Sequence, residues 1–290
     1  MRYSIKDLEN YTSIKAHTLR IWEQRYGLLE PKRTDSNIRY YSEDDLKKIL
    51  NVNLLYTNGL KISKIAKLSE DEILEHVREL IDERAEKDQP EIHPFMLAIT
   101  EMDPDQIHDL LNKNYAEKGM VELYNSLLIP VLMRIGELWQ VNTLSIAHEH
   151  LFSNVLRAFL IVRISKLDKP KEGSKNAILF LPGHEEHELS LLFYHYILKS
   201  SGVNCIYLGA KVPLDDLKSS VVSMKPDVVI SNLIAKMDEK EVIAMFKEME
   251  EFIPLKKVRI GGAQALYYKN VIPKDISFIR NEEDLIRDLK

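Results

Sequence analysis

The chain has 290 residues, of which 45% are hydrophobic and 29% are charged, a composition typical of folded globular proteins rather than disordered or fibrous ones. No apolar run approaches the roughly 18–20 residues that a membrane-spanning helix needs, and the N-terminus lacks the apolar segment of a signal peptide. The single cysteine, Cys205, excludes an internal disulfide and a multi-cysteine zinc site. We therefore expect a cytoplasmic protein that does not associate with a membrane.

Charge is divided unevenly along the chain, although the net charge is only −5. Residues 1–67 carry a surplus of Lys and Arg, with a balance of +5, and the remaining residues have a balance of −10. Any polyanionic partner is therefore expected to bind the N-terminal part.

The N-terminal part reads as short helices followed by a small hairpin. Ser4 with Asp7 three residues later predicts a capped first helix, and Ser13 is expected to cap a second helix with Leu19 and Trp22 on its inner face. The segment "KRTDSN" and then "IRYY" predict a β-wing, and Ser42 is expected to cap a helix over 43–53. This order favours a winged helix-turn-helix.

The middle of the chain shows helical periodicity without a strong strand pattern. Residues 68–90 are highly charged and predict a helical linker or a partner-facing helix. Residues 91–167 predict three or four helices, broken near Asp103-Pro104, at Pro130 and at Asn142-Thr143, and a four-helix bundle is the simplest packing for them.

The last part alternates between short apolar runs and amphipathic stretches. The runs "AILFLP", "VNCIYLG", "PDVVIS", "KVRIGG" and "ISFI" predict strands, the first four being typical of strands buried on both faces. Helices are expected over 188–200, 214–224, 240–250 and the closing "NEEDLIRDL". This alternation indicates a doubly wound parallel sheet of the Rossmann or flavodoxin-like type. The predicted domains are 1–70 (winged helix-turn-helix), 71–90 (helical linker), 91–170 (helical bundle) and 175–290 (α/β sheet).

The N-terminal motifs resemble the MerR-type winged helix-turn-helix over about 70 residues. The shared elements are the helix over 13–24, "RYGLL" at 25–29 and the wing "RTDSNIRYY" at 33–41, followed by another helix. The resemblance implies binding to a near-palindromic double-stranded DNA operator as a dimer or higher oligomer. A helix fits the major groove, and wing residues can hold phosphates. The candidate DNA contacts are Lys15, His17, Thr18, Arg20, Tyr26, Arg33, Asn37, Arg39 and Tyr40.

Charged residues crowd the turn after the first predicted strand, in "LPGHEEHELS". The stretch resembles the Asp/Glu-x-His-x-x-Gly motif of cobalamin-binding domains, with Glu185, His187 and Ser190 at the three positions. The resemblance implies that His187 is a ligand of cobalt and that Glu185 orients it, which suits imidazole and carboxylate chemistry. Ser190 departs from the pattern, because the family usually has Gly there.

Two further segments match later motifs of the same family. Ser231 and Leu233 in "SNL" correspond to its Ser-x-Leu motif, and Gly261-Gly262 corresponds to its Gly pair. The resemblance implies that these residues line the slot for the nucleotide tail of cobalamin.

In the helical segment, Trp139 is followed after nine residues by Glu149-His150. This spacing resembles the bundle motif of the CarH/LitR-like photoreceptor regulators. The resemblance implies that the three side chains surround the upper ligand of adenosylcobalamin, a Trp face being suited to covering an apolar group.

Together these resemblances imply a DNA-binding transcriptional repressor rather than an enzyme, with oligomerisation and DNA binding controlled by adenosylcobalamin and by light. One alternative is a MerR-like repressor that needs no cobalamin and uses its sheet domain only for assembly. A second, less favoured alternative is a component of a corrinoid-dependent enzyme, for which the chain offers no substrate domain.

Overall fold

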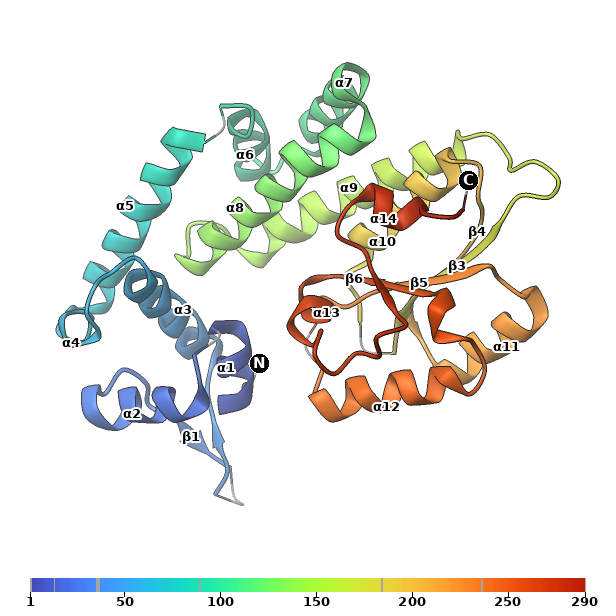
Figure 1. The fold of residues 1–290 in the computed structure, drawn as a ribbon. Coiled ribbons are helices and arrows are strands. Elements are labelled where there is room, and N and C mark those ends of the chain that lie inside the picture. Colours follow the sequence, from blue (N-terminus) through green and yellow to red (C-terminus); the bar gives the residue numbers. More distant parts are fainter. Residues whose placement is uncertain are drawn as a thin grey trace. The chain divides into compact units, whose positions relative to one another are not determined.

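The structure, a computed structural model, describes residues 2–12, 14–34, 37–88, 90–183, 185–235 and 237–289, without the side chains of Asn10 and residues 82–88. The chain forms two compact units, Met1–Phe152 and Ser153–Lys290, each with the elements labelled in Figure 1. Among the described residues, no helix has the length and apolarity that crossing a membrane requires.

The first unit begins with the expected winged helix-turn-helix, called the head below. Its elements are α1 (Ile5–Thr12), α2 (Ala16–Tyr26), β1 (Lys32–Arg33), the antiparallel β2 (Arg39–Tyr40), α3 (Glu43–Thr57) and α4 (Ile62–Ile65). The caps at Ser4 and Ser42 are confirmed, since Ser4 exchanges hydrogen bonds with Asp7 and Ser42 forms a capping box with Asp45. The predicted cap at Ser13 lies outside the described residues, as do Asp35 and Ser36 of the wing.

A helix that the sequence placed in a linker contributes to the core of the head. Helix α5 (Glu70–Asp88) buries Ile73, Val77 and Ile81 in the same cluster as Leu19 and Trp22. The helix itself was expected, but its apolar face is covered by the head rather than kept for a partner. Val141 of the following bundle joins this cluster.

The bundle helices are α6 (His93–Thr100), α7 (Pro104–Leu123), the π-helical turn η1 (Tyr124–Leu128), α8 (Ile129–Gln140) and α9 (Ile146–Ser165). Breaks at Asp103-Pro104 and at Asn142 are confirmed. The break predicted at Pro130 is wrong, because the helical backbone continues from η1 directly into α8. Pro130 stands in the first turn of α8, where the helix needs no N–H from it. A kink instead occurs at Gly119, whose φ of 75° and ψ of 173° are not helical.

The second unit contains the predicted parallel sheet. The described residues form the strands β3 (Asn176–Pro182), β4 (Asn204–Val212), β5 (Val228–Asn232), β6 (Val258–Gly261) and β7 (Ser277–Phe278), in the order β4-β3-β5-β6-β7. This is the flavodoxin-like order. Only "VNCIYLG" departs from the expected full burial, since β4 is an edge strand and most of its residues are half-buried.

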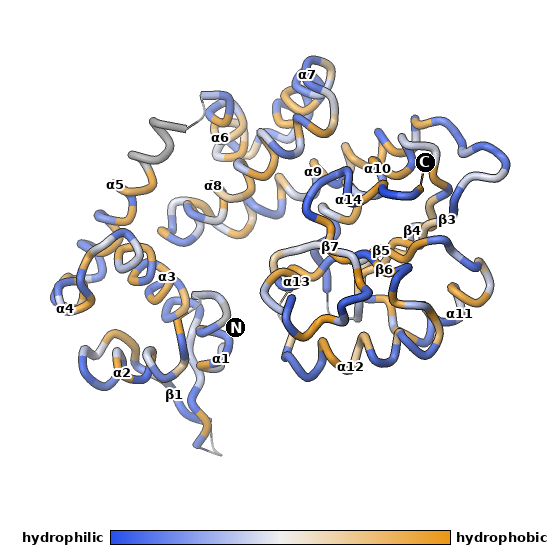
Figure 2. Tube along the Cα trace, in the orientation of Figure 1, coloured by the Kyte–Doolittle hydropathy of each residue, from blue (hydrophilic) through white to orange (hydrophobic). Residues whose placement is uncertain are grey.

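Helices cover both faces of this sheet (Figure 1). Helix α10 (Glu188–Ser200) packs on one face together with α14 (Glu282–Ile286), and α11 (Leu214–Met224) and α12 (Glu239–Glu250) pack on the other. The strands are predominantly hydrophobic along the trace in Figure 2, as burial between two helical layers requires. A short helix, α13 (Ala263–Tyr267), was not expected and begins directly after the glycine pair.

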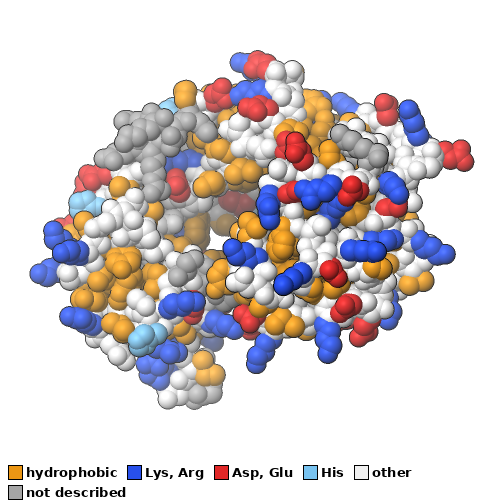
Figure 3. Space-filling view, viewed as in Figure 1, with side chains coloured by type: hydrophobic (Ala, Val, Ile, Leu, Met, Phe, Trp, Pro, Cys, Tyr) orange, Lys and Arg blue, Asp and Glu red, His pale blue; other side chains and the backbone are white. Residues whose placement is uncertain are grey.

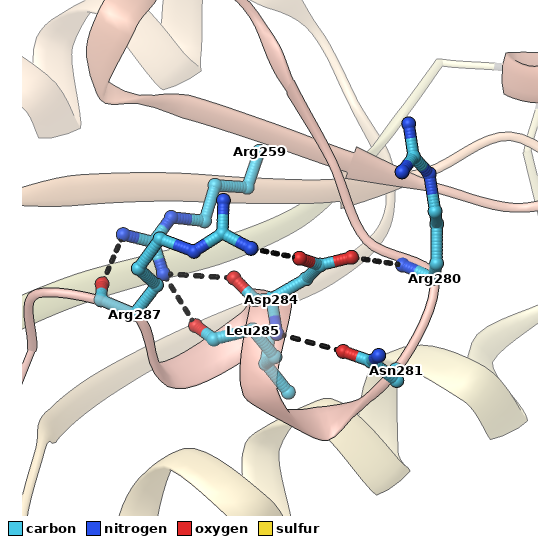
Figure 4. A network of polar contacts seen from close by, with 6 residues as sticks. All are labelled: Arg259, Arg280, Asn281, Asp284, Leu285 and Arg287. Carbon is cyan, nitrogen blue, oxygen red and sulfur yellow. Dashed lines mark hydrogen bonds and ion pairs between the residues drawn. The ribbon is translucent and has the colours of Figure 1, made fainter.

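A single arginine of β6 fixes the C-terminal segment to the sheet (Figure 4). The Arg259 guanidinium donates to the backbone carbonyls of Asp284 and Leu285, at 3.1 and 2.7 Å, and to that of Arg287. These carbonyls end α14 and would otherwise lack a helical partner. Arg259 therefore holds α14 in place against α10.

Replacing Arg259 with Met keeps much of the side-chain volume but removes these donors. We expect Arg259→Met to lower the free energy of unfolding by about 2 kcal/mol, measured by urea denaturation. The side chain of Arg280 points away from this network in Figure 4, so Arg280→Met is the matched control and should change stability by less than about 0.5 kcal/mol. Equal effects of the two substitutions would show that the hydrogen bonds of Arg259 do not stabilise the C-terminal segment.

Candidate functional site

A fully buried carboxylate organises the turn after β3. The side chain of Glu185 is 0% exposed. Its Oε1 accepts the backbone N–H of His187 at 3.0 Å and the imidazole Nδ1 of His187 at 2.5 Å. Its Oε2 accepts the backbone N–H groups of Ile234 and Ala235 at 2.7 and 2.5 Å. Glu185 thus ties the turn after β3 to the turn after β5.

These contacts fix the charge of Glu185 and the tautomer of His187. Burial alone raises the pKa of Glu185, but the hydrogen bonds from His187, Ile234 and Ala235 outweigh it and lower the pKa to about 2. An ionised carboxylate can only accept, so Nδ1 of His187 carries the proton and donates it. In the neutral ring, the lone pair then lies on Nε2. The His187 side chain is 56% exposed, in contrast to its buried partner.

The pair lies where α/β sheets of this type bind ligands. Chain order reverses between β3 and β5, which are neighbours in the sheet. Ligands of doubly wound sheets occupy the crevice outside the carboxyl ends of the strands at such a switch point. Glu185 follows β3, and Ile234 and Ala235 follow β5, so the structure brings the predicted His turn to this position.

The other predicted sheet residues meet at the next strand ends. Leu233 is 0% exposed and belongs to the core, while Ser231 is 3% exposed and its hydroxyl has no hydrogen-bond partner among the described residues. A Cβ on Gly262 would overlap the backbone carbonyl of Leu233, and Gly262 also has a φ of 96°, so only glycine fits there. Ser190 lies in the first turn of α10 and is half-buried.

Sequence reasoning missed two residues at these strand ends. Asn232 is 1% exposed, and neither atom of its amide group has a partner among the described residues. The hydroxyl of Tyr194, on α10, approaches Gly261 closely enough to overlap any Cβ placed there. Position 232 is the unspecified residue of "SNL" and Tyr194 lies in an amphipathic helix, so neither carried a signal in the sequence.

The three predicted residues of the bundle lie on α8 and α9. Trp139 is half-buried rather than part of the core, and the ammonium of Lys47 lies 4.6 Å from its ring centroid. Glu149 Oε2 and Nδ1 of the neighbouring His150 are 2.7 Å apart, and the His150 side chain is 66% exposed. Large apolar side chains, Met133 and Ile146, are exposed on the same two helices.

Trp139 also belongs to a contact between the bundle and the head. Lys47 of α3 donates to Asn142 at 2.8 Å, and the Gln140 side-chain amide donates to Asn51 Oδ1 at 2.8 Å. Arg78 of α5 donates to the Val141 carbonyl at 3.2 Å. The turn between α8 and α9 is therefore held against α3 and α5.

The predicted DNA contacts differ in how accessible they are. Lys15, directly before α2, and His17 and Arg20 of α2 are exposed, and Thr18 is half-buried. At the wing, Arg33 donates to Asn37 Oδ1 at 2.7 Å, whereas Arg39 Nε lies 3.4 Å from Glu23 Oε1. Tyr26 and Tyr40 are half-buried, and each faces a guanidinium: Arg25 lies 5.4 Å from the Tyr26 ring centroid, and Arg2 lies 4.7 Å from that of Tyr40. Figure 3 shows Lys and Arg side chains gathered on the visible face of the head.

Comparisons with known proteins agree with this division of the chain. Residues 3–72 match the MerR HTH family regulatory protein, and residues 91–163 match a B12 binding domain. The HTH-type transcriptional repressor CarH of Myxococcus xanthus is 28% identical over 97% of this chain and 96% of its own length. The HTH-type transcriptional repressor CarA of the same organism is 25% identical over 99% of this chain and 96% of its own.

The chain is similar to CarH and CarA over nearly its full length. It combines a MerR-type helix-turn-helix with a B12-binding domain, and the predicted order of these parts is confirmed. The monomethylamine corrinoid protein of Methanosarcina barkeri, 15% identical, covers 65% of this chain and 91% of its own length with a TM-score of 0.52, and thus shares the fold of helices and parallel sheet.

Glu185→Gln tests the electrostatic role of the buried carboxylate. Because folding lowers the pKa of Glu185 from its ordinary 4.5 to about 2, its contribution to stability is present above about pH 4.5 and is lost as the pH falls towards 2. We expect Glu185→Gln to cost about 3 kcal/mol at pH 7 and progressively less below pH 4.5, measured by urea denaturation at several pH values.

The neighbouring Glu186 provides the control for this substitution. Its side chain is 65% exposed and pairs with Lys211 at the surface. Glu186→Gln should therefore have a much smaller effect at pH 7. A Glu185→Gln penalty that does not change between pH 7 and pH 3 would show that shape, and not charge, is what the site requires.

Proposed function

We propose that this protein is a DNA-binding transcriptional repressor, and not an enzyme, whose activity is controlled by cobalamin. The observation that carries the proposal is the His187–Glu185 pair. An exposed imidazole, held by its Nδ1 on a buried carboxylate, stands at the switch point of a flavodoxin-like sheet. The homologous repressors support the regulatory role, and the proposed location is the cytoplasm.

The residues present fit a corrinoid. His187 offers cobalt a neutral nitrogen donor, and the Glu185 carboxylate makes that donor more basic and fixes its orientation. At the neighbouring strand ends, Ser231 and Asn232 keep buried polar atoms without partners among the described residues, and Gly261-Gly262 lets the Tyr194 hydroxyl, the Asn232 amide and the Leu233 carbonyl approach the backbone closely. A nucleotide tail can use these buried polar atoms. We therefore assign His187 to cobalt and the slot beside Ser231 to the tail.

The upper ligand is assigned to the bundle. Trp139 presents a half-buried ring, and exposed apolar side chains lie on the same two helices, which suits an adenosyl group. Glu149 can accept a hydrogen bond from a ribose hydroxyl, and the exposed His150 beside it offers a second imidazole. When bound, adenosylcobalamin supplies a cobalt–carbon bond that light breaks. Adenosylcobalamin is therefore the proposed form, and light the proposed signal.

DNA binding is assigned to the head. Helix α2 presents His17 and Arg20 at its surface, with Lys15 directly before it, as a helix in the major groove requires. Arg33 and Asn37 are hydrogen-bonded to each other in the wing and suit contacts to phosphates. Arg39 and Tyr40 are proposed to support the wing as well as to contact DNA, because Arg39 already pairs with Glu23.

The first test is the binding of cobalamin. Full-length protein titrated with adenosylcobalamin in darkness should give the absorption spectrum of a histidine-ligated corrinoid, and His187→Ala should lose that spectrum and at least about tenfold in affinity. His76→Ala, which removes an exposed imidazole from α5, is the control and should bind as the wild type does. An unchanged spectrum in His187→Ala would support instead a repressor that needs no cobalamin.

The second test concerns assembly and light. A ligand changes assembly only if it binds the two arrangements with different affinity. With adenosylcobalamin in darkness, gel filtration should give a dimer or tetramer that retards operator DNA, and green light should convert it to a smaller species with weaker retardation. An equal mass before and after illumination would refute light control.

A further inference from the structure

We propose that Asn232 and Tyr194 select the corrinoid by the base at the end of its nucleotide tail, and that they favour a base such as adenine over dimethylbenzimidazole. The inference rests on the proposed function, in which the strand ends at Ser231 and Gly261 receive the tail. It concerns two side chains that the sequence motifs leave unspecified.

The first observation is a buried amide without partners. Asn232 is 1% exposed, and neither its Nδ2 nor its Oδ1 has a hydrogen-bond partner among the described residues. Buried polar groups in folded proteins are nearly always paired, and leaving one unpaired costs free energy. A partner supplied by a ligand would recover that cost. The neighbouring Ser231 hydroxyl is also buried and has no hydrogen-bond partner among the described residues.

The second observation is the direction in which this amide points. A Cβ built on Gly261 would lie 2.9 Å from Asn232 Oδ1, and one built on Gly262 would lie 2.8 Å from it. The amide therefore faces the glycine pair, which carries no side chain of its own. It does not face the core cluster to which Leu233 belongs.

The third observation is the tyrosine on the opposite side. The Tyr194 hydroxyl reaches the same space beside Gly261 from α10. Ser190 lies four residues earlier, so the two side chains share one face of that helix. A hydroxyl from α10 and an amide from β5 thus meet beside Gly261, and a base that enters there must displace the hydroxyl while it pairs with the amide.

The chemistry of these groups separates the two bases. An asparagine amide pairs in a bidentate manner with adenine, accepting from the amino group and donating to the adjacent ring nitrogen. The corresponding edge of dimethylbenzimidazole carries methyl groups and no donor. A site built to hydrogen-bond its ligand discriminates strongly against an analogue without those groups, because its buried polar atoms then stay unpaired. The amide of Asn232 therefore favours adenine.

The test compares three corrinoids on the full-length protein. Adeninylcobamide, cobalamin and cobinamide, which has no nucleotide, are titrated in their aquo forms and followed by absorbance. We expect wild-type protein to bind adeninylcobamide at least about tenfold more tightly than cobalamin. Asn232→Leu should reduce this ratio to about twofold or less and leave cobinamide affinity unchanged. Tyr194→Phe should reduce the ratio in part.

Controls separate recognition from folding. Asn204→Leu makes the same exchange at the exposed amino end of β4 and should preserve the ratio. Without ligand, Asn232→Leu should raise the melting temperature, because it removes a buried unpaired amide. Asn232→Ala provides a smaller replacement with the same expected loss of discrimination.

The outcomes distinguish this inference from the function on which it rests. Equal binding of adeninylcobamide and cobalamin by the wild type, with cobinamide also bound, would overturn the inference and keep the proposed function. Binding of none of the three would overturn both. A lower melting temperature with weaker cobinamide binding in both Asn232 variants would make this residue structural and also overturn the inference.

Discussion

The candidate site depends on a carboxylate that has no access to water. Burying an ionised group is costly unless it is paired and hydrogen-bonded, and Glu185 meets this condition through donors from two separate turns. The backbone N–H groups of Ile234 and Ala235 are available only because the chain turns directly after β5. The imidazole of His187 is thus positioned by sheet topology as much as by its own turn.

At the same edge of the sheet, other buried polar groups have no hydrogen-bond partner among the described residues. Where Glu185 has every oxygen in use, Ser231 and Asn232 have buried polar atoms without partners among the described residues. Unpaired groups of this kind are rare, and a bound water, ion or ligand is one explanation for them. One half of the site is therefore preorganised without a ligand, and the other half is left incomplete. Such a division favours a ligand with a metal at one end and a polar group at the other.

Most of the fold was predictable from the sequence, because buried strands and capped helices leave strong local patterns. The bounds of α10 and α11 match the expected 188–200 and 214–224, and the glutamate–histidine turn was identified by its resemblance to the motif of cobalamin-binding domains. Pro130 was misread and the kink at Gly119 was missed, since the effect of each residue depends on backbone angles that no pattern reveals. Tyr194 and Asn232 were missed for a different reason. Their meaning comes from the close approach of both side chains to Gly261, which occurs only in the folded sheet.

The contacts of the first unit connect Trp139 of the bundle to the DNA-binding head. Lys47 lies over the Trp139 ring and also donates to Asn142, so one side chain of α3 contacts both the ring and the turn that follows it. Whatever covers that face of Trp139 competes with Lys47, and a displaced ammonium gives up the Asn142 contact as well. Losing both contacts weakens the attachment of α3 to the bundle, leaving mainly the hydrogen bonds between Asn51 and Gln140. Because α3 packs against α1 and α5, direct contacts connect Trp139 to the head through Lys47.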